Sequence, residues 1–139
     1  MKIEIDSVSI ILNEQRLIYD LYYFVGGEFE GLTETAIVKK ILAKWAGVLI
    51  DHRAKDHPLF LPYNLEDESV ECLRAIQDAD KIILRLVRVN ENGWAVDVND
   101  LGGFMISPHE ILEESPDAFA EYNKDEFIAG LVNARVINS

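Results

Sequence analysis

The sequence has a single cysteine, Cys72, so the chain cannot form an internal disulfide. It opens on MKIEID, without the positively charged and apolar leader of a secreted protein. It also lacks a long apolar run. The richest segment, AIVKKILAKWAGVLI, contains three lysines, whereas a membrane-spanning helix needs about 20 apolar residues. These absences predict a soluble protein of the reducing cytoplasm with no membrane partner.

Basic residues are also scarce. The chain has 13 lysines and arginines against 25 aspartates and glutamates, a formal net charge of −12. Because this charge repels phosphates, we expect no nucleic-acid partner. The acidic residues concentrate in residues 63–80 and 107–139, and they serve either solubility alone or partner binding. As partner-binding candidates we predict a first patch of Glu66, Asp67, Glu68 and Glu71, and a second patch of Glu110, Glu113 and Glu114.

The strongest hint of a metal site is the pairing of histidine and aspartate in residues 51–57. The ligand types present are those that bind zinc, namely Asp51, His52, Asp56 and His57. Their spacing matches no compact metal motif, and the third histidine, His109, is far away in the sequence. We therefore expect no metal.

Motifs for catalysis or cofactor binding are missing as well. Gly26 and Gly27 are not followed by the Lys-Ser/Thr pair that holds phosphates, and Gly102 and Gly103 lack a dinucleotide fingerprint. No serine or cysteine is set in a strand-turn-helix elbow with a base and an orienting acid. The sequence therefore predicts a protein without a cofactor and without enzymatic activity.

The clearest structural pattern runs from Lys81 to Ile106. Residues 81–89 and 94–98 are rich in β-branched and large apolar side chains, and they flank Asn92-Gly93, a pair that favours a tight hairpin turn. We predict a hairpin whose first strand is central and covered on both faces. After the next two glycines, residues 104–106 are expected to form a bulged continuation or a short third strand.

The N-terminal part predicts a second hairpin and then a helix. Residues 2–12 alternate in polarity, Asn13-Glu14 suits a turn, and residues 15–25 are aromatic and β-branched. From Thr33, a plausible N-cap, the apolar period changes to 3.6 and continues to Gly47. This is the most strongly patterned helix of the chain.

Helical patterns recur later in the chain. Residues 51–64 contain two prolines and are expected to be a loop, whereas the apolar spacing in residues 67–77 predicts a short helix. Start signals at Ser107 and Ser115 and an apolar stripe over residues 124–135 predict a helical C-terminal third. The final VINS is expected to fray or to add an edge strand.

These elements define the expected architecture. We predict one α+β domain over residues 1–139, with a mostly antiparallel sheet built from two hairpins and packed by amphipathic helices. Five aromatic residues are candidates for a recognition surface, although Trp94 is expected to pack on its hairpin: Tyr22, Tyr23, Phe24, Tyr63 and Trp94.

The segment LYYFVGGEFEGL, residues 21–32, is followed by a helix opening TETAIV. Together they resemble the N-terminal part of small acidic immunity proteins from bacterial polymorphic-toxin and contact-dependent inhibition systems. In that family an aromatic strand turns through a glycine-containing segment and leads into an amphipathic helix. The resemblance implies a cytoplasmic protein that binds and neutralises a cognate toxin domain, many of which are basic. It transfers no contact residue and identifies no toxin.

Two other classes of function stay open at this point. One is a small ligand-binding or adaptor module in which the aromatic strand lines a pocket. The other is an enzyme acting on a basic or neutral substrate. The oligomeric state does not follow from the sequence.

Overall fold

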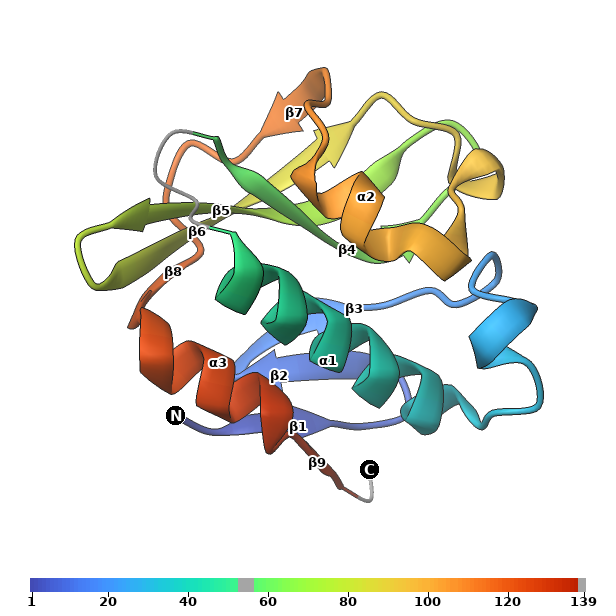
Figure 1. Cartoon of the computed structure of the whole chain (residues 1–139), viewed down its shortest axis with the longest axis horizontal. Coiled ribbons are helices and arrows are strands. Elements are labelled where there is room, and N and C mark those ends of the chain that lie inside the picture. Colours follow the sequence, from blue (N-terminus) through green and yellow to red (C-terminus); the bar gives the residue numbers. More distant parts are fainter. Residues whose placement is uncertain (53–56, 138–139) are drawn as a thin grey trace.

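A computed structural model describes residues 1–52 and 57–137 (Figure 1). The fold is α+β, as predicted, and its strands form two mostly antiparallel sheets. The strands are β1 (Ile3–Ile5), β2 (Ser9–Leu12), β3 (Gln15–Ile18), β4 (Leu59–Leu65), β5 (Val70–Asp78), β6 (Lys81–Val89), β7 (Ile111–Glu114), β8 (Ala120–Asn123) and β9 (Arg135–Val136). The helices are α1 (Glu34–Asp51), α2 (Leu101–Ile106) and α3 (Lys124–Val132), with short 3-10 turns η1 (Gly27–Phe29), η2 (Gly93–Ala95) and η3 (Val98–Asp100).

The first sheet has the strand order β3-β2-β1-β9. Asn13 and Glu14 form the predicted turn between β2 and β3, with φ angles of 44° and 77°. Residues 2–12, before this turn, contain the two strands β1 and β2, because the chain reverses direction between Ile5 and Ser9. The segment after it leaves the sheet at Ile18, so the aromatic residues that follow are not a continuous strand, contrary to the prediction.

The second sheet has the order β4-β5-β6-β7, and β8 also pairs with β6. β7 pairs with Val87–Val89 and β8 with residues 81–84, so the two short strands follow one another along the same edge of β6. Along β6 the buried residues change face. The side chains of Ile82 and Leu84 are buried on one face of the sheet. Val87 comes three residues after Leu84, so its side chain points to the opposite face, where it is buried. The prediction that this strand is central is confirmed, whereas each half of the strand is fully buried on one face only, and the residues of the other face are partly buried or exposed.

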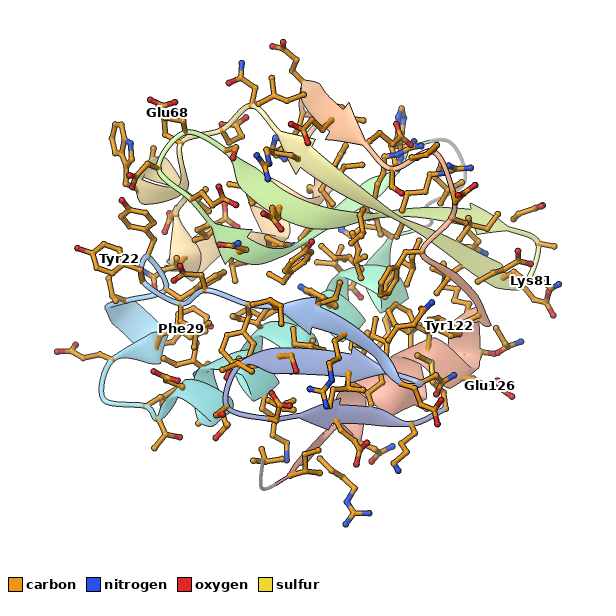
Figure 2. The ribbon with its side chains drawn as sticks, turned by 180° about the vertical axis from the view of Figure 1, so that it is seen from behind. Tyr22, Phe29, Glu68, Lys81, Tyr122 and Glu126 are labelled. Atoms are coloured by element: carbon orange, nitrogen blue, oxygen red, sulfur yellow. The ribbon has the colours of Figure 1, made fainter. Side chains whose placement is uncertain are left out.

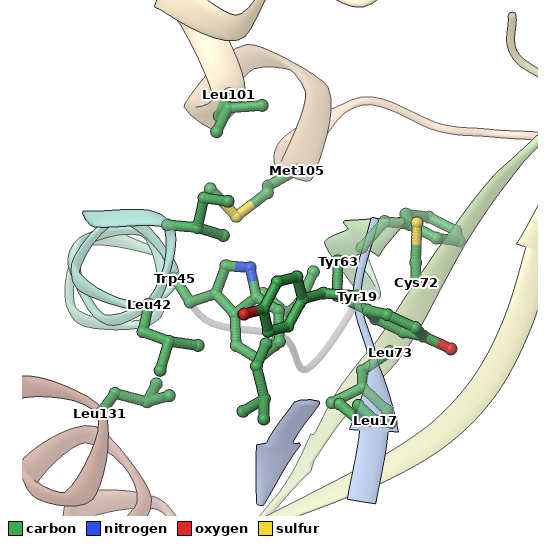
Figure 3. Close-up of a cluster of buried hydrophobic side chains, with 14 of the residues drawn as sticks. Leu17, Tyr19, Leu42, Trp45, Tyr63, Cys72, Leu73, Leu101, Met105 and Leu131 are labelled. Atoms are coloured by element: carbon green, nitrogen blue, oxygen red, sulfur yellow. The ribbon is translucent and has the colours of Figure 1, made fainter. Parts of the chain in front are cut away.

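Helix α1 lies against both sheets and beside α3 (Figure 1). It begins where the sequence predicts, since the Thr33 hydroxyl accepts a hydrogen bond from the Ala36 amide, but it passes Gly47 and ends at Asp51. Trp45 is fully buried, and its indole N–H donates to the Pro62 carbonyl at 3.1 Å. Figure 3 shows Trp45 pointing from α1 into the cluster formed with Met105 and the side chains of the sheets. Burying each such side chain contributes roughly 1.5–3 kcal/mol.

Residues 67–77 were predicted to be helical, and this prediction is wrong: most of the segment is strand β5. The buried face of β5 changes between two neighbouring residues, Cys72 and Leu73. This change places buried Val70 and Leu73 three residues apart, a spacing that imitates a helix. The hairpin partner of β6 is therefore β5, joined at Asp78–Lys81.

The predicted hairpin turn at Asn92-Gly93 is wrong as well. The Gly93 amide donates a 2.7 Å hydrogen bond to the Glu66 carbonyl, and a Cβ on Gly93 would lie 2.2 Å from that oxygen. Glycine is needed here for a close approach between two backbones. The chain then forms η2 and η3, and residues 104–106 belong to α2, where Asp100 caps the Gly103 amide at 3.1 Å.

The C-terminal third is only partly helical. Ser107 does not begin a helix, since it follows α2 and its hydroxyl donates to the Gly103 carbonyl at 2.6 Å. Ser115 lies between β7 and β8 rather than at a helix start. Helix α3 is confirmed, capped by the Asn123 side chain, and after it the chain adds β9 in parallel to β1. No helix within the described residues is long and apolar enough to cross a membrane.

Candidate protein-binding surface

The loop after β3 and the turn between β4 and β5 meet at one end of the molecule. Asp20 forms an isolated bridge with Asn64, next to the end of β4. The Tyr23 hydroxyl donates a hydrogen bond to the Asp67 carboxylate, which raises the pKa of Tyr23 to about 12. These contacts join segments more than 40 positions apart in the sequence. These contacts also bring Asp20 to the acidic patch, which was predicted from the sequence to contain only residues between Glu66 and Glu71.

The segment from Asn92 to Ala95 completes this region. Because the Gly93 amide is bonded to the Glu66 carbonyl, the neighbouring Trp94 is held next to the acidic turn. Trp94 is 64% exposed and does not pack on a hairpin, contrary to the prediction. We call the resulting region the acidic–aromatic surface; it consists of Asp20, Tyr22, Tyr23, Glu66, Asp67, Glu68 and Trp94.

The aromatic candidates divide clearly between core and surface. Tyr22 is 75% exposed and contacts Tyr23 edge to face, with ring centroids 4.9 Å apart. Figure 2 shows Tyr22 and Glu68 on the same side of the molecule. Phe24 and Tyr63 are buried, so they serve the core rather than the surface. Strand alternation does not decide which of Tyr22, Tyr23 and Phe24 is buried, because these residues lie in a loop.

Charge in the acidic–aromatic surface is unbalanced. Four carboxylates, those of Asp20 and of Glu66–Glu68, line a shared hollow, and Arg88 is the basic residue among the described residues that line it. Arg88 is already engaged, because its guanidinium donates to Glu71 at 3.3 Å. The net field in front of this surface is therefore negative.

Glu71 belongs to the predicted first patch but does not line the same hollow as Glu66, Asp67 and Glu68. Its carboxylate accepts hydrogen bonds from the Tyr63 hydroxyl and from Arg88, each at 3.3 Å. A hydrogen bond with Glu71 raises the pKa of Glu66, and burial raises it further. Glu71 thus contacts the acidic–aromatic surface through Glu66 and Arg88, while Glu68 and Asp67 are the exposed members.

The predicted second patch lies on β7 and just before it. Glu114 pairs with Arg74 at 2.5 Å and lies 3.9 Å from Arg85, so its charge is largely compensated. Glu113 is exposed, and with Glu71 it lines a hollow of about 280 Å³. Glu110 lies outside that hollow and accepts a 3.2 Å hydrogen bond from Asn90. The two predicted patches therefore approach each other through Glu71 and Glu113, with Arg88 between them.

The residues considered for metal binding form no ligand group within the described part of the chain. His52 and His57 are exposed, and Asp56 lies outside the described residues. In the described part of the chain, no three histidine, cysteine, aspartate or glutamate side chains group as metal ligands. Cys72 is fully buried, and burial raises the pKa of its thiol, which leaves it protonated at neutral pH.

Comparison with known proteins finds no family whose model matches this chain, and no significantly similar curated protein or solved structure. The function is therefore argued from the surface itself.

Proposed function

We propose that this chain is a stoichiometric binding protein of the immunity type, which occupies and neutralises a toxin domain in the cytoplasm and performs no catalysis. The observation that supports the proposal is the acidic–aromatic surface, where exposed Tyr22 and Trp94 stand beside a group of carboxylates. The sequence resemblance of residues 21–32 and the helix after them to immunity proteins suggests a toxin domain as the class of partner, although the aromatic segment is a loop here rather than a strand.

The two kinds of side chain act at different stages of binding. Carboxylates such as Asp67 and Glu68 attract a basic partner and raise the association rate, toward about 10⁸ M⁻¹s⁻¹ at low salt. Tyr22 and Trp94 expose large, rigid side chains that lose little conformational freedom when covered, and such residues commonly dominate binding energy. A basic surface with apolar recesses is therefore the expected complement.

The surface is held in shape before binding. The Tyr23–Asp67 and Gly93–Glu66 hydrogen bonds fix the three contributing segments to one another. Because these segments are already ordered, association has less conformational entropy to overcome than the ordering of free loops would require. Preorganisation of this kind favours tight, long-lived complexes.

The test is co-expression with a toxin domain encoded beside this chain. Growth should be restored by the wild-type protein, and the purified complex should contain one copy of each chain by light scattering. The double variant Tyr22→Ala/Trp94→Ala should lose the rescue while remaining folded. Ile50→Ala, which shortens a similarly exposed side chain on α1, is the matched control and should rescue fully.

Failure of the wild-type protein to rescue growth or to form a complex would contradict the immunity proposal. The ligand-binding alternative makes a different prediction, namely that a set of metabolites raises the melting temperature of the isolated protein by an amount that depends on ligand concentration. Rescue that survives the double variant would leave immunity intact but would exclude this surface.

A further inference from the structure

A third hollow, of about 520 Å³, adjoins the acidic–aromatic surface. It lies between the end of β3, the loop that follows it and the first turn of α1. Asp20 and Tyr22 belong to both regions, so the two are continuous. We call it the apolar hollow; its described lining consists of Ser7, Val8, Ile18, Tyr19, Asp20, Leu21, Tyr22, Phe24, Val25, Glu34 and Ile37.

Apolar side chains on the rim of the hollow are unusually exposed. Val8 is 54%, Ile18 61% and Val25 64% exposed, and Tyr22 stands among them. Single exposed apolar residues are ordinary, but several around one concave site are typical of an interaction surface. Deeper in the lining, Phe24 is fully buried and gives the hollow an apolar floor.

The charged residues of the hollow are all acidic. Asp20 and Glu34 line it, and no lysine or arginine of the described chain does so. Both carboxylates are exposed at the surface. An apolar recess with a negative rim complements an apolar side chain that has positive charges next to it.

We propose that the apolar hollow receives an apolar side chain of the partner protein, carried on a segment with lysine or arginine at the neighbouring positions. This inference rests on the proposed function, because it names the feature by which the same partner is recognised. The inserted side chain buries Ile18 and Val25, while the flanking cations approach Asp20 and Glu34.

A second copy of this chain is a poorer occupant. In a two-fold contact through the hollow, Asp20 and Glu34 of one copy would face the same carboxylates of the other, within a chain of net charge −12. Like charges placed opposite one another oppose association. A basic segment of a different protein meets no such repulsion.

The test uses short peptides as probes, so it does not depend on finding the toxin. The first peptide has one phenylalanine between two lysines on each side; the second replaces the phenylalanine with serine, and the third replaces the lysines with glutamates. Each is titrated into the isotope-labelled full chain, and amide chemical shifts are followed by NMR. The first peptide should shift the amides of Val8, Ile18 and Val25, and should bind at least about tenfold tighter than the other two.

Two variants of the chain show whether the first peptide binds in the apolar hollow. Ile18→Ser/Val25→Ser should abolish the response to the first peptide, whereas Ile50→Ser, at another exposed apolar position, should not change it. Equal binding of the lysine peptides with and without phenylalanine, shifts confined to other residues, or no shifts would overturn the proposal. So would concentration-dependent dimerisation of the chain alone that the double variant abolishes. None of these results bears on growth rescue, which tests the immunity proposal separately.

Discussion

Replacing Gly93 with alanine tests how Trp94 is held at the acidic turn. A Cβ at this position would lie 2.2 Å from the Glu66 carbonyl oxygen and 2.8 Å from the carbonyl carbon of Leu65. Both are backbone atoms that cannot rotate away, so η2 must move off the turn and the 2.7 Å hydrogen bond from the Gly93 amide must break. The lost hydrogen bond contributes about 1 kcal/mol and the steric strain about 1–3 kcal/mol.

We therefore expect Gly93→Ala to lower the free energy of unfolding by about 2–4 kcal/mol, and the melting temperature by roughly 6–12 °C for a chain of this size. Urea denaturation followed by circular dichroism measures the loss. Gly47→Ala is the matched control. It lies inside α1 with no neighbouring heavy atom within 4 Å, so alanine should stabilise the protein by about 0.5–1 kcal/mol.

Opposite signs for these two glycine substitutions are the essential result. If Gly93→Ala changed the free energy of unfolding by less than about 0.5 kcal/mol, the close backbone approach at Glu66 would not exist in solution. The placement of Trp94 beside the carboxylates would then lose its structural basis.

Further predictions concern the core and the first sheet. Burial acts to raise the pKa of Asp6, but hydrogen bonds from Val8, Arg16 and Ser9 outweigh it and lower the pKa to about 2. Because the folded pKa lies below the ordinary value of 3.8, the stabilisation is complete above about pH 4 and is lost as the pH falls toward 2. Wild type should lose about 1–2 kcal/mol more than Asp6→Asn over that interval in urea titrations, after allowance for solvent screening; equal losses would contradict the role of Asp6. Trp45→Phe removes the donor to the Pro62 carbonyl and should cost about 2–3 kcal/mol by the same assay, and a cost below about 1 kcal/mol would show that the buried hydrogen bond is absent.

The elements that the sequence predicted best are those with local signals. Helix α1 begins at a capping threonine and keeps one apolar stripe, and α3 likewise has its own cap and stripe. The turn at Asn13 needs positive φ angles, which asparagine adopts more readily than most residues. These features depend on neighbours in the sequence, so a local pattern is sufficient to find them.

The errors arise where distant contacts decide the structure. The sequence of β5 has a helical pattern because its buried face changes between Cys72 and Leu73. This change depends on which distant elements cover the two ends of the sheet. Gly93 looked like a hairpin turn, although it is required by contact with Glu66, a residue 27 positions earlier. A local pattern cannot distinguish these two uses of glycine.

The candidate site divides in the same way. The acidic run Glu66–Glu68 was predicted to bind a partner from charge alone, and this stays a prediction; the structure places the three residues around one hollow, with Asp67 and Glu68 exposed. Its aromatic neighbours could not be assigned, since the exposure of Trp94 and the bridge from Asp20 depend on how three separate segments meet. The compensation of Glu114 by arginines of β5 and β6 was equally hidden, because it depends on strand pairing.

The most direct measurement of the central claim is the association rate of the toxin domain with Glu68→Lys, at low and moderate salt. Glu68 is exposed, so the substitution reverses a charge of the acidic–aromatic surface without disturbing the core. Asp117→Lys, which reverses the charge of another exposed residue, between β7 and β8, is the control. We expect Glu68→Lys to slow association about tenfold and to weaken its salt dependence, with little change for Asp117→Lys. The same association rate and salt dependence for both variants and the wild type would contradict the claim that this surface meets the partner.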